Sequence, residues 1–316
     1  MGSRYYRRRY FFCQSCDLSM SVESSIFSTL TSWWDGPDRD LHGLQRVGAG
    51  QAPLLHFLHG NGFSAHTLAP MADALPSDWN LLLTDVPGHG GSQQPAHHMP
   101  DWLRMARRVG DALETRNDGR KAIGIGHSMG GVMTLMLAAE RPHLFERIIL
   151  LDPVLFSAEI LLFQRLARKT GLWKRGALVK AVQARRAVWP DADNLRQDLQ
   201  RKSLYRNWDV AALEGFIQGA TKPTPEGLEL ACNPAWEAAI FGSYPRGLWQ
   251  AVHRVRVPVD ILVAADSYPF ILKSARKAAK ANQHIRFEMA PGSHCFPMEQ
   301  PLKTAQRIQE LLTQKS

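Results

Sequence analysis

The architecture of this chain follows from the segment Lys121-Ala-Ile-Gly-Ile-Gly-His-Ser-Met-Gly-Gly131. A short apolar run leads into Gly126-His-Ser-Met-Gly130, and residues 132–140 then have helical character. A serine on a sharp strand-to-helix turn is held in a strained backbone conformation, and the residues two before and two after it must be small because strand and helix nearly touch. Gly126 and Gly130 occupy these positions. The pattern predicts a nucleophile elbow at Ser128, and the alternative, a glycine-rich turn with a solvated serine, is disfavoured by the strand before it and the helix after it.

The composition is that of a globular protein, with 45% hydrophobic and 21% charged residues among 316. No run approaches the roughly 18 apolar residues that a membrane span needs. Residues 1–20 interleave Arg with Tyr and Phe and make a poor signal peptide, so we expect a disordered or added leader, with Met20 as a candidate start. The same interleaving is found where nucleic-acid bases stack, but we favour the leader and expect no nucleic-acid partner.

The cysteines support neither a metal site nor a disulfide framework. Cys13 and Cys16 form a pair, but no second pair stands at zinc-site spacing, and Cys232 and Cys295 are isolated. A low cysteine content agrees with a reducing compartment. We therefore expect a cytoplasmic protein without a metal.

Strand-like and helix-like segments alternate along the first half of the chain. Two short strands are expected within residues 28–47, and the further expected strands and helices are 53–59, 66–75, 79–84, 101–115, 121–127, 132–140 and 147–151. Such alternation predicts a parallel sheet with helices on both faces. Right-handed crossovers place the loops after the strands along one edge, where ligands bind.

Four motifs together carry a resemblance to a known family. They are His59-Gly60, Asp85-Val-Pro-Gly-His-Gly-Gly-Ser92, the elbow around Ser128, and a late histidine, His294. In this order the chain resembles the α/β-hydrolase fold superfamily, in its capped serine-hydrolase branch, over most of residues 53–316. The resemblance implies an α/β fold with an eight-stranded, mostly parallel sheet, an inserted helical cap, a Ser-acid-His triad and no cofactor.

The resemblance also implies a division of the chain. Residues 21–155 and 255–316 would form the core, and residues 156–254 would form the cap. The cap sequence is helical in character and shows no strand alternation. Between residues 156 and 210 it carries twelve Lys and Arg against five Asp and Glu. A basic amphipathic cap fits an anionic lipid surface or an acidic carrier, but we favour a lid whose charges are simply solvated.

The position of the triad acid is the least settled of the site residues. Residues 257–265 are expected to form a strand, and Asp266 follows at the place where the family usually has its acid, although the loop lacks the common glycine. The rival is Asp152, in Leu150-Leu-Asp-Pro153 after the preceding strand. We favour Asp266 on the chain order Ser, acid, His. A cap of the following helix is the alternative role of Asp266.

The base is assigned to His294, in the loop between an expected strand at 284–289 and a final helix at 302–312. His59, His89, His127 and His143 have plainer roles in turns, loop support or a helix surface. The oxyanion hole is assigned to the backbone N–H groups of Met129 and Asn61, the latter being the residue after His59-Gly60.

These assignments predict ester hydrolysis through an acyl-enzyme. A serine at the elbow argues against chemistry that uses a carboxylate nucleophile, such as dehalogenation and epoxide hydrolysis. Lipase, thioesterase, acyltransferase, perhydrolase and carbon-carbon hydrolase activities reuse the same triad, and a non-catalytic ligand-binding homologue is the alternative from another class. Apolar cap residues facing Ser128 would favour short to medium acyl chains. They are Leu161, Leu162, Phe163, Leu166, Trp173, Trp189, Phe216, Trp236 and Phe241.

Overall fold

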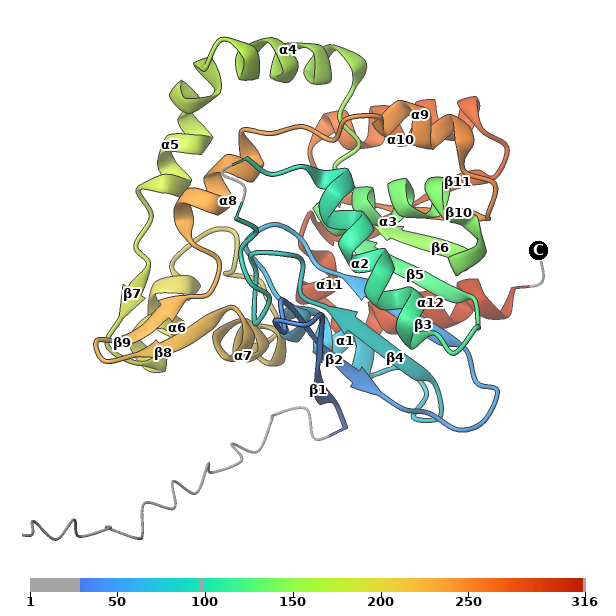
Figure 1. Cartoon of the computed structure of the whole chain (residues 1–316), viewed down its shortest axis with the longest axis horizontal. Coiled ribbons are helices and arrows are strands. Elements are labelled where there is room, and N and C mark those ends of the chain that lie inside the picture. Colours follow the sequence, from blue (N-terminus) through green and yellow to red (C-terminus); the bar gives the residue numbers. More distant parts are fainter. Residues whose placement is uncertain (1–28, 97–98, 315–316) are drawn as a thin grey trace, which may run out of the picture.

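The computed structural model describes residues 29–96 and 99–314 (Figure 1). The expected leader at residues 1–20, the candidate start at Met20, and Cys13 and Cys16 lie outside these ranges. Within the described part of the chain, strands and helices alternate from the first parallel strand to the elbow helix, as the sequence predicts.

One sheet of eight strands organises the molecule, in the order β1-β2-β4-β3-β5-β6-β10-β11. β2 pairs antiparallel with β1 and with β4, and the other neighbours are parallel. The strands are β1 (Thr31–Asp35), β2 (Leu41–Arg46), β3 (Leu54–Leu58), β4 (Asn80–Thr84), β5 (Ala122–His127), β6 (Phe145–Leu151), β10 (Val259–Asp266) and β11 (Ile285–Ser293). The predicted mostly parallel eight-stranded sheet is confirmed.

The central strands are buried on both faces, which is why their sequences are nearly continuous apolar runs. Successive side chains of a strand point to opposite faces. In β3, Leu54 and Leu58 therefore join one apolar core, while Leu55 and Phe57 join the other.

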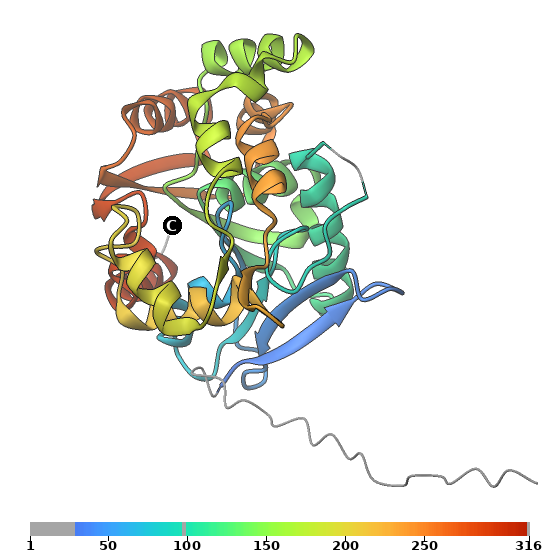
Figure 2. The ribbon, with the colours of Figure 1, turned by 90° about the vertical axis from the view of Figure 1, so that its left-hand side faces the viewer.

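Each core is closed by its own layer of helices, and Figure 2 shows helices on both sides of the strands. The first layer holds α2 (Trp102–Arg116), α3 (Met129–Glu140), α9 (Leu248–Arg254) and α10 (Pro269–Ala281). The second holds α1 (Ala65–Asp73), α7 (Val210–Gly219), α11 (Phe296–Glu299) and α12 (Pro301–Thr313). A short 3-10 helix, η1 (Pro142–Leu144), joins α3 to β6. The expected helices on both faces are thus present.

The segment between β6 and β10, residues 156–254, is called the insertion below. Its helices are α4 (Ala158–Lys169), η2 (Leu172–Arg175), α5 (Ala177–Gln183), α6 (Ala192–Gln200), α7, α8 (Pro234–Phe241) and α9. Ser157 explains where α4 begins, because its hydroxyl oxygen accepts the N–H of Ile160 at 3.3 Å. The helices α7 and α9 pack against α1 and α3, so the insertion returns twice to the main body.

The insertion is mostly helical, but it also contains three short strands that the sequence analysis did not predict. A small sheet has the order β7-β9-β8, formed by β7 (Val188–Trp189), β8 (Thr221–Thr224) and β9 (Gly227–Leu230). β8 and β9 form a hairpin whose turn ends at Gly227 with φ +122°, a conformation that favours glycine. Strands of two to four residues are too short to show an alternating pattern.

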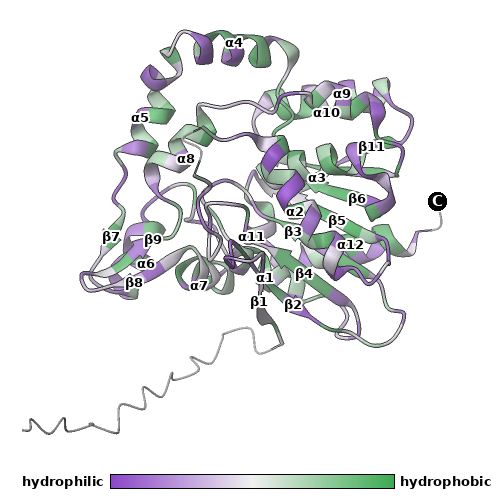
Figure 3. Cartoon of the chain, in the orientation of Figure 1, coloured by the Kyte–Doolittle hydropathy of each residue, from purple (hydrophilic) through white to green (hydrophobic). Residues whose placement is uncertain are grey.

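The hydropathy of the residues agrees with this division into a buried sheet and outer helices (Figure 3). The strands of the main sheet are mostly hydrophobic, whereas helices such as α2 and α12 mix hydrophilic and hydrophobic residues. Among the helices of residues 29–96 and 99–314, none has the length and apolar character needed to span a bilayer.

Candidate active site

Ser128 stands at the apex of the turn from β5 to α3. Its backbone has φ +54° and ψ −115°, a conformation that L-residues rarely adopt and that marks a strained site. A Cβ at Gly126 would lie 2.5 Å from the carbonyl oxygen of Gly130, and one at Gly130 would overlap the carbonyl oxygen of Leu58. Only glycine fits at either position. The predicted elbow geometry is therefore present, and its cause is the contact between backbones.

His294 connects Ser128 to a carboxylate. The Nε2 atom lies 2.9 Å from the Ser128 hydroxyl oxygen, and Nδ1 lies 2.6 Å from Oδ2 of Asp152. A neutral imidazole protonated on Nδ1 satisfies both contacts, with Nδ1–H donating to the carboxylate and Nε2 accepting from the hydroxyl. The sequence prediction placed Ser128 and His294 together, and the structure does so.

The carboxylate beside His294 belongs to Asp152, so the preference for Asp266 is wrong. Asp152 is fully buried, and its Oδ1 accepts the N–H of Ala264 at 2.9 Å. Oδ2 accepts the hydroxyl of Ser267 as well as the imidazole N–H. Three donors hold the Asp152 side chain in one orientation.

Asp266 has a different environment. It is the exposed last residue of β10, and within the described ranges its side chain makes no hydrogen bond. A register irregularity between Ala264 and Asp266 changes the pairing with β11 there. The alternative role as a helix cap is also wrong, because the N-cap of α10 is Tyr268. The end of β10 supports the carboxylate of Asp152 instead of supplying one.

The loop after β3 brings Gly60 against Ser128. A Cβ at Gly60 would lie 3.3 Å from the Ser128 Cβ, so the backbone of this loop touches the serine. The N–H groups of Asn61 and Met129 donate no hydrogen bond within the described part of the chain. Met129 begins α3, where the first N–H groups have no partner within the helix. Two backbone donors near Ser128 are thus available to an anion.

The profile of the Alpha/beta hydrolase family matches residues 57–307. The chain belongs to this family. Serine hydrolase-like protein 2 of Homo sapiens is 27% identical over 288 residues, covering 84% of this chain and 88% of that protein. Pimeloyl-[acyl-carrier protein] methyl ester esterase of Vibrio parahaemolyticus is 29% identical over 100 residues, which span 32% of this α/β hydrolase and 36% of that enzyme.

Solved structures share the fold of this α/β hydrolase. The crystal structure of E-2-(acetamidomethylene)succinate hydrolase superposes with a TM-score of 0.72 at 21% identity, covering 90% of this chain and all of the other. At this identity the likeness concerns the fold alone. The fold of the chain is thus that of the family.

The side chain of Asn61 ties the Gly60–Asn61 loop to the insertion. Its Nδ2 donates to the carbonyl oxygen of Glu237 in α8 at 3.1 Å, and its Oδ1 lies 3.1 Å from Nε2 of His89. Glu237 is itself buried and paired with Arg185 at 2.8 Å. Burial raises the pKa of the Glu237 carboxyl, an effect that Arg185 opposes. The position of the Asn61 N–H therefore depends on residues of the insertion.

A second carboxylate, Asp85, organises the backbone behind this loop. Asp85 is fully buried and accepts from the N–H groups of Ala65 at 2.6 Å and Gly91 at 2.9 Å, while the imidazole of His42 lies at 2.6 Å. Burial acts to raise the pKa of Asp85, but the hydrogen bond and charge of His42 outweigh it and leave the pKa lowered. His59 bridges the loops, with Nδ1 at 2.7 Å from the Gly60 carbonyl oxygen and Nε2 accepting from Val86 N–H at 2.9 Å.

The buried histidines of this region have the supporting roles that the sequence favoured. Burial lowers the pKa of His89 and of His127 to about 3, so both are neutral at ordinary pH. His127 lies 2.8 Å through Nε2 from the carbonyl oxygen of His294 and stacks on Phe63 at a centroid distance of 6.0 Å. It thereby holds the loop that carries the candidate base. His143 lies on η1, is exposed and contacts Glu114.

The structure also corrects the predicted lining of the substrate site. Leu162, Phe163, Leu166 and Phe241 are exposed to solvent, and Trp189, Phe216 and Trp236 are buried within the two cores. The aromatic groups that do stand beside the reacting side chains are Phe63, which stacks on His127, and Tyr268, whose ring lies 5.3 Å from that of His294. Ser267 and Tyr268 carry no signal in one sequence, because each depends on contacts between distant segments.

Proposed function

We propose that this α/β hydrolase cleaves carboxylic esters, with short to medium acyl chains, through a covalent acyl-enzyme on Ser128. The observation that carries the proposal is the pair of contacts of His294, at 2.9 Å to the Ser128 hydroxyl oxygen and 2.6 Å to the Asp152 carboxylate. A nucleophile, a base and a group that orients the base are the parts required for acyl transfer.

In the first half-reaction the Ser128 oxygen bonds to the ester carbonyl carbon while its proton passes to His294 Nε2. Asp152 keeps the second ring proton on Nδ1 and stabilises the imidazolium that forms. The tetrahedral intermediate then collapses, the bond to the alcohol oxygen breaks, and His294 returns the proton to that oxygen. The alcohol leaves, and Ser128 carries the acyl group.

In the second half-reaction water replaces the alcohol. His294 takes a proton from the water, whose oxygen attacks the acyl carbonyl carbon. The bond to Ser128 breaks, the proton returns to the serine oxygen, and a carboxylic acid leaves. No cofactor enters this cycle.

The negative charge of each tetrahedral intermediate falls on the former carbonyl oxygen. We assign the N–H groups of Asn61 and Met129 as its donors. Each is unused in the described structure, and the loop of Asn61 touches Ser128 at Gly60. Loss of one such donor costs about 3 to 4 kcal/mol of transition-state stabilisation.

The ester specificity rests on two supports. One relative is named as a methyl ester esterase, which acts on an ester bond. Phe63 and Tyr268 offer apolar surface beside His127 and His294, and such surface contributes about 0.8 kcal/mol for each methylene that it buries. Because several of the large apolar residues of the insertion are exposed to solvent or buried in the cores, this surface favours short to medium acyl groups over long ones.

The test is a series of p-nitrophenyl esters from acetyl to lauroyl, assayed with the wild type and with Ser128→Ala. We expect rates that rise from acetyl to butyryl or hexanoyl and then fall. Ser128→Ala should lower kcat about a million-fold, to near the background rate. Ser203→Ala, an exposed serine in the insertion, is the matched control and should retain full activity. More than a few per cent of the wild-type rate in clean Ser128→Ala would refute the nucleophile, and an optimum at lauroyl would favour a lipase.

A further inference from the structure

The outer side of α4 carries large apolar side chains in water. Phe163 is 72% exposed, Leu162 58% and Leu166 55%. Residues spaced by three and four lie on one side of a helix, so these three form a continuous stripe. Leu172 of η2, also exposed, extends it. We call these four residues the α4 face. Figures 1 and 2 show α4 at the outer limit of the molecule in both views.

Positive charge surrounds the α4 face. Residues 156–184 contain six Lys and Arg and one acidic residue, Glu159. Arg168 is engaged with the carbonyl oxygen of Gly242 at 3.1 Å and the ring of Trp173. The exposed cations beside the stripe are Arg165, Lys169, Lys174 and Arg175. A helix with an exposed apolar stripe flanked by cations is the pattern of a segment that lies in a membrane interface.

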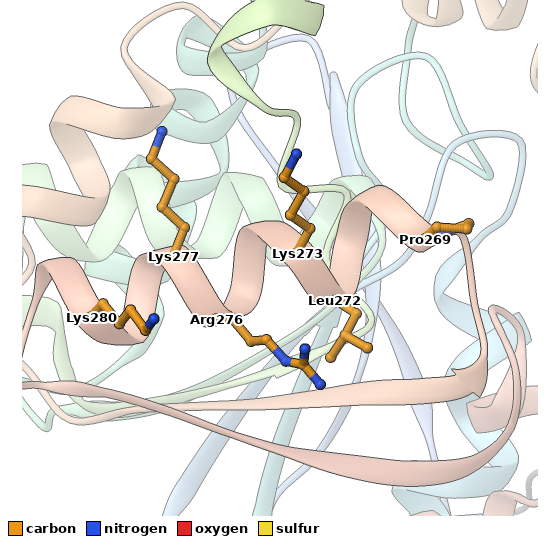
Figure 4. A pocket seen from close by; sticks show the side chains of 6 residues that line it. All are labelled: Pro269, Leu272, Lys273, Arg276, Lys277 and Lys280. Atoms are coloured by element: carbon orange, nitrogen blue, oxygen red, sulfur yellow. The ribbon is translucent and has the colours of Figure 1, made fainter.

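A second group of cations stands near the start of α4. A shallow hollow on α10 is lined by Pro269, Leu272, Lys273, Arg276, Lys277 and Lys280, with no carboxylate among them. Figure 4 shows Lys273 pointing toward the segment that leads into α4, while the Nζ atom of Lys277 lies 4.7 Å from the ring centroid of Trp249. The charges of both lysines act on Glu159 of α4 and help to lower the pKa of its carboxyl, after the larger effects of local hydrogen bonds. The basic region therefore extends from the α4 face onto α10.

We propose that the α4 face docks on the surface of an anionic lipid bilayer, with its apolar stripe at the acyl boundary and the surrounding cations on lipid headgroups. Apolar burial and attraction to anionic headgroups add in this arrangement. A second copy of the chain is a poorer partner, because pairing two α4 faces would bring two sets of six cations together. An acidic protein would match the charge, but the stripe projects from an outer helix and fits a deformable surface. The docking is independent of the chemistry at Ser128.

The test uses the full chain and sedimentation with vesicles of phosphatidylcholine alone or with roughly a third phosphatidylglycerol. We expect binding to the anionic vesicles at least about tenfold tighter than to the neutral ones, and weakened by added salt because the Debye length shortens. Phe163→Ser/Leu166→Ser should weaken binding at least about tenfold. Leu302→Ser, an equally exposed apolar residue on α12, is the matched control and should bind as the wild type.

A second pair of variants tests the charges. Arg165→Glu/Lys169→Glu should abolish the preference for anionic vesicles, whereas Lys303→Glu on α12 should not. Unchanged melting temperatures and ester hydrolysis would show that all variants are folded. Wild-type binding by both α4 variants would overturn the proposal. A second result would also overturn it: no vesicle binding by the wild type, together with a wild-type dimer that Phe163→Ser/Leu166→Ser dissociates, because a second copy would then cover the α4 face. Binding of the wild type to an acidic protein but to no vesicle would overturn it in favour of that partner.

Discussion

β6 and β10 are neighbouring parallel strands that end at the same edge of the sheet, each beside an aspartate, yet the two carboxylates differ in every respect. Asp152 is fully buried, has φ +45° and accepts from Ala264, Ser267 and His294. Asp266 is exposed and has no such partners in the described ranges. The difference shows that the identity of the acid in the proposed triad depends on which strand end faces the elbow.

The sheet order explains the outcome. β6 pairs directly with β5, which carries the elbow, whereas β10 is one strand further away. The N–H of Ser128 donates to the carbonyl oxygen of Leu151 at 3.0 Å, so the residue before Asp152 is bonded to the nucleophile itself. The left-handed turn at Asp152 then places its side chain beneath His294, and aspartate tolerates this conformation better than most residues.

The largest expected effect is at the end of β6. Asp152→Asn should lower kcat on the order of ten-thousand-fold, because an amide does not stabilise the imidazolium and favours the wrong tautomer of His294. The substitution conserves volume, so we expect the protein to remain folded. Steady-state kinetics with butyryl ester and a thermal unfolding curve measure both properties. A loss of less than about tenfold in a folded variant would remove Asp152 from the triad.

Substitution of Ser267 should have an intermediate effect on kcat. Ser267 follows β10, and its hydroxyl donates to the carboxylate of Asp152 at the end of β6. Ser267→Ala removes one donor to Asp152 and should lower kcat about tenfold with little change in KM, because a hydrogen bond to a charged group contributes about 1.5 to 3 kcal/mol and solvent recovers part of it. Ser267→Thr keeps the hydroxyl and is the matched control. Equal rates for Ala and Thr variants would show that this hydroxyl does not act through Asp152.

Burial at the catalytic edge also predicts how stability depends on pH. His127 has a pKa of about 3 in the folded protein against an ordinary 6.5. Below about pH 6.5, His127 therefore binds a proton in the unfolded chain but not in the folded chain. The contribution of His127 to the free energy of unfolding is complete above pH 6.5 and falls by up to about 1.4 kcal/mol per pH unit as the pH drops toward 3.

Denaturant unfolding of the wild type and of His127→Gln between pH 7 and 5 measures this contribution. Glutamine retains a donor for the His294 carbonyl oxygen but does not titrate. We expect a shallower loss of stability in the variant. Parallel curves for the two proteins would show that His127 is not buried in its neutral form.

The smallest effect is expected at the end of β10. Asp266→Asn should leave kcat/KM within about twofold of the wild type, as for an exposed residue without partners. The same ester assay measures it. A loss above tenfold would reverse the comparison between the two strand ends.

The parts of the fold that backbone sterics impose could be predicted from the sequence. Gly126 and Gly130 are required wherever a serine stands on this turn, and the long apolar runs of β3 and β5 specify buried parallel strands. The strands of the insertion could not be predicted, since β7 has two residues. The local sequence pattern decides the elbow and the strands of the main sheet, whereas pairing with distant segments decides the strands of the insertion.

The choice between the two aspartates shows the same limit. The order Ser, acid, His is satisfied by Asp152 and by Asp266 alike, so chain order does not distinguish them. The adjacency of β5 and β6 does distinguish them, but it is a property of the sheet. The exposure of Phe163 could not be predicted for a related reason, because an amphipathic helix has the same sequence pattern whether its apolar side is covered or not.

The rate at which a fluorophosphonate inactivates the enzyme tests the central claim most directly, because it reports the nucleophilicity of Ser128 without any assumption about the natural substrate. Mass spectrometry of the labelled wild type should locate the adduct on the peptide that contains Ser128. We predict that Asp152→Asn lowers the second-order inactivation rate constant at least about a hundredfold, while Asp266→Asn leaves it unchanged. Slow labelling of Asp266→Asn with normal labelling of Asp152→Asn would contradict the account.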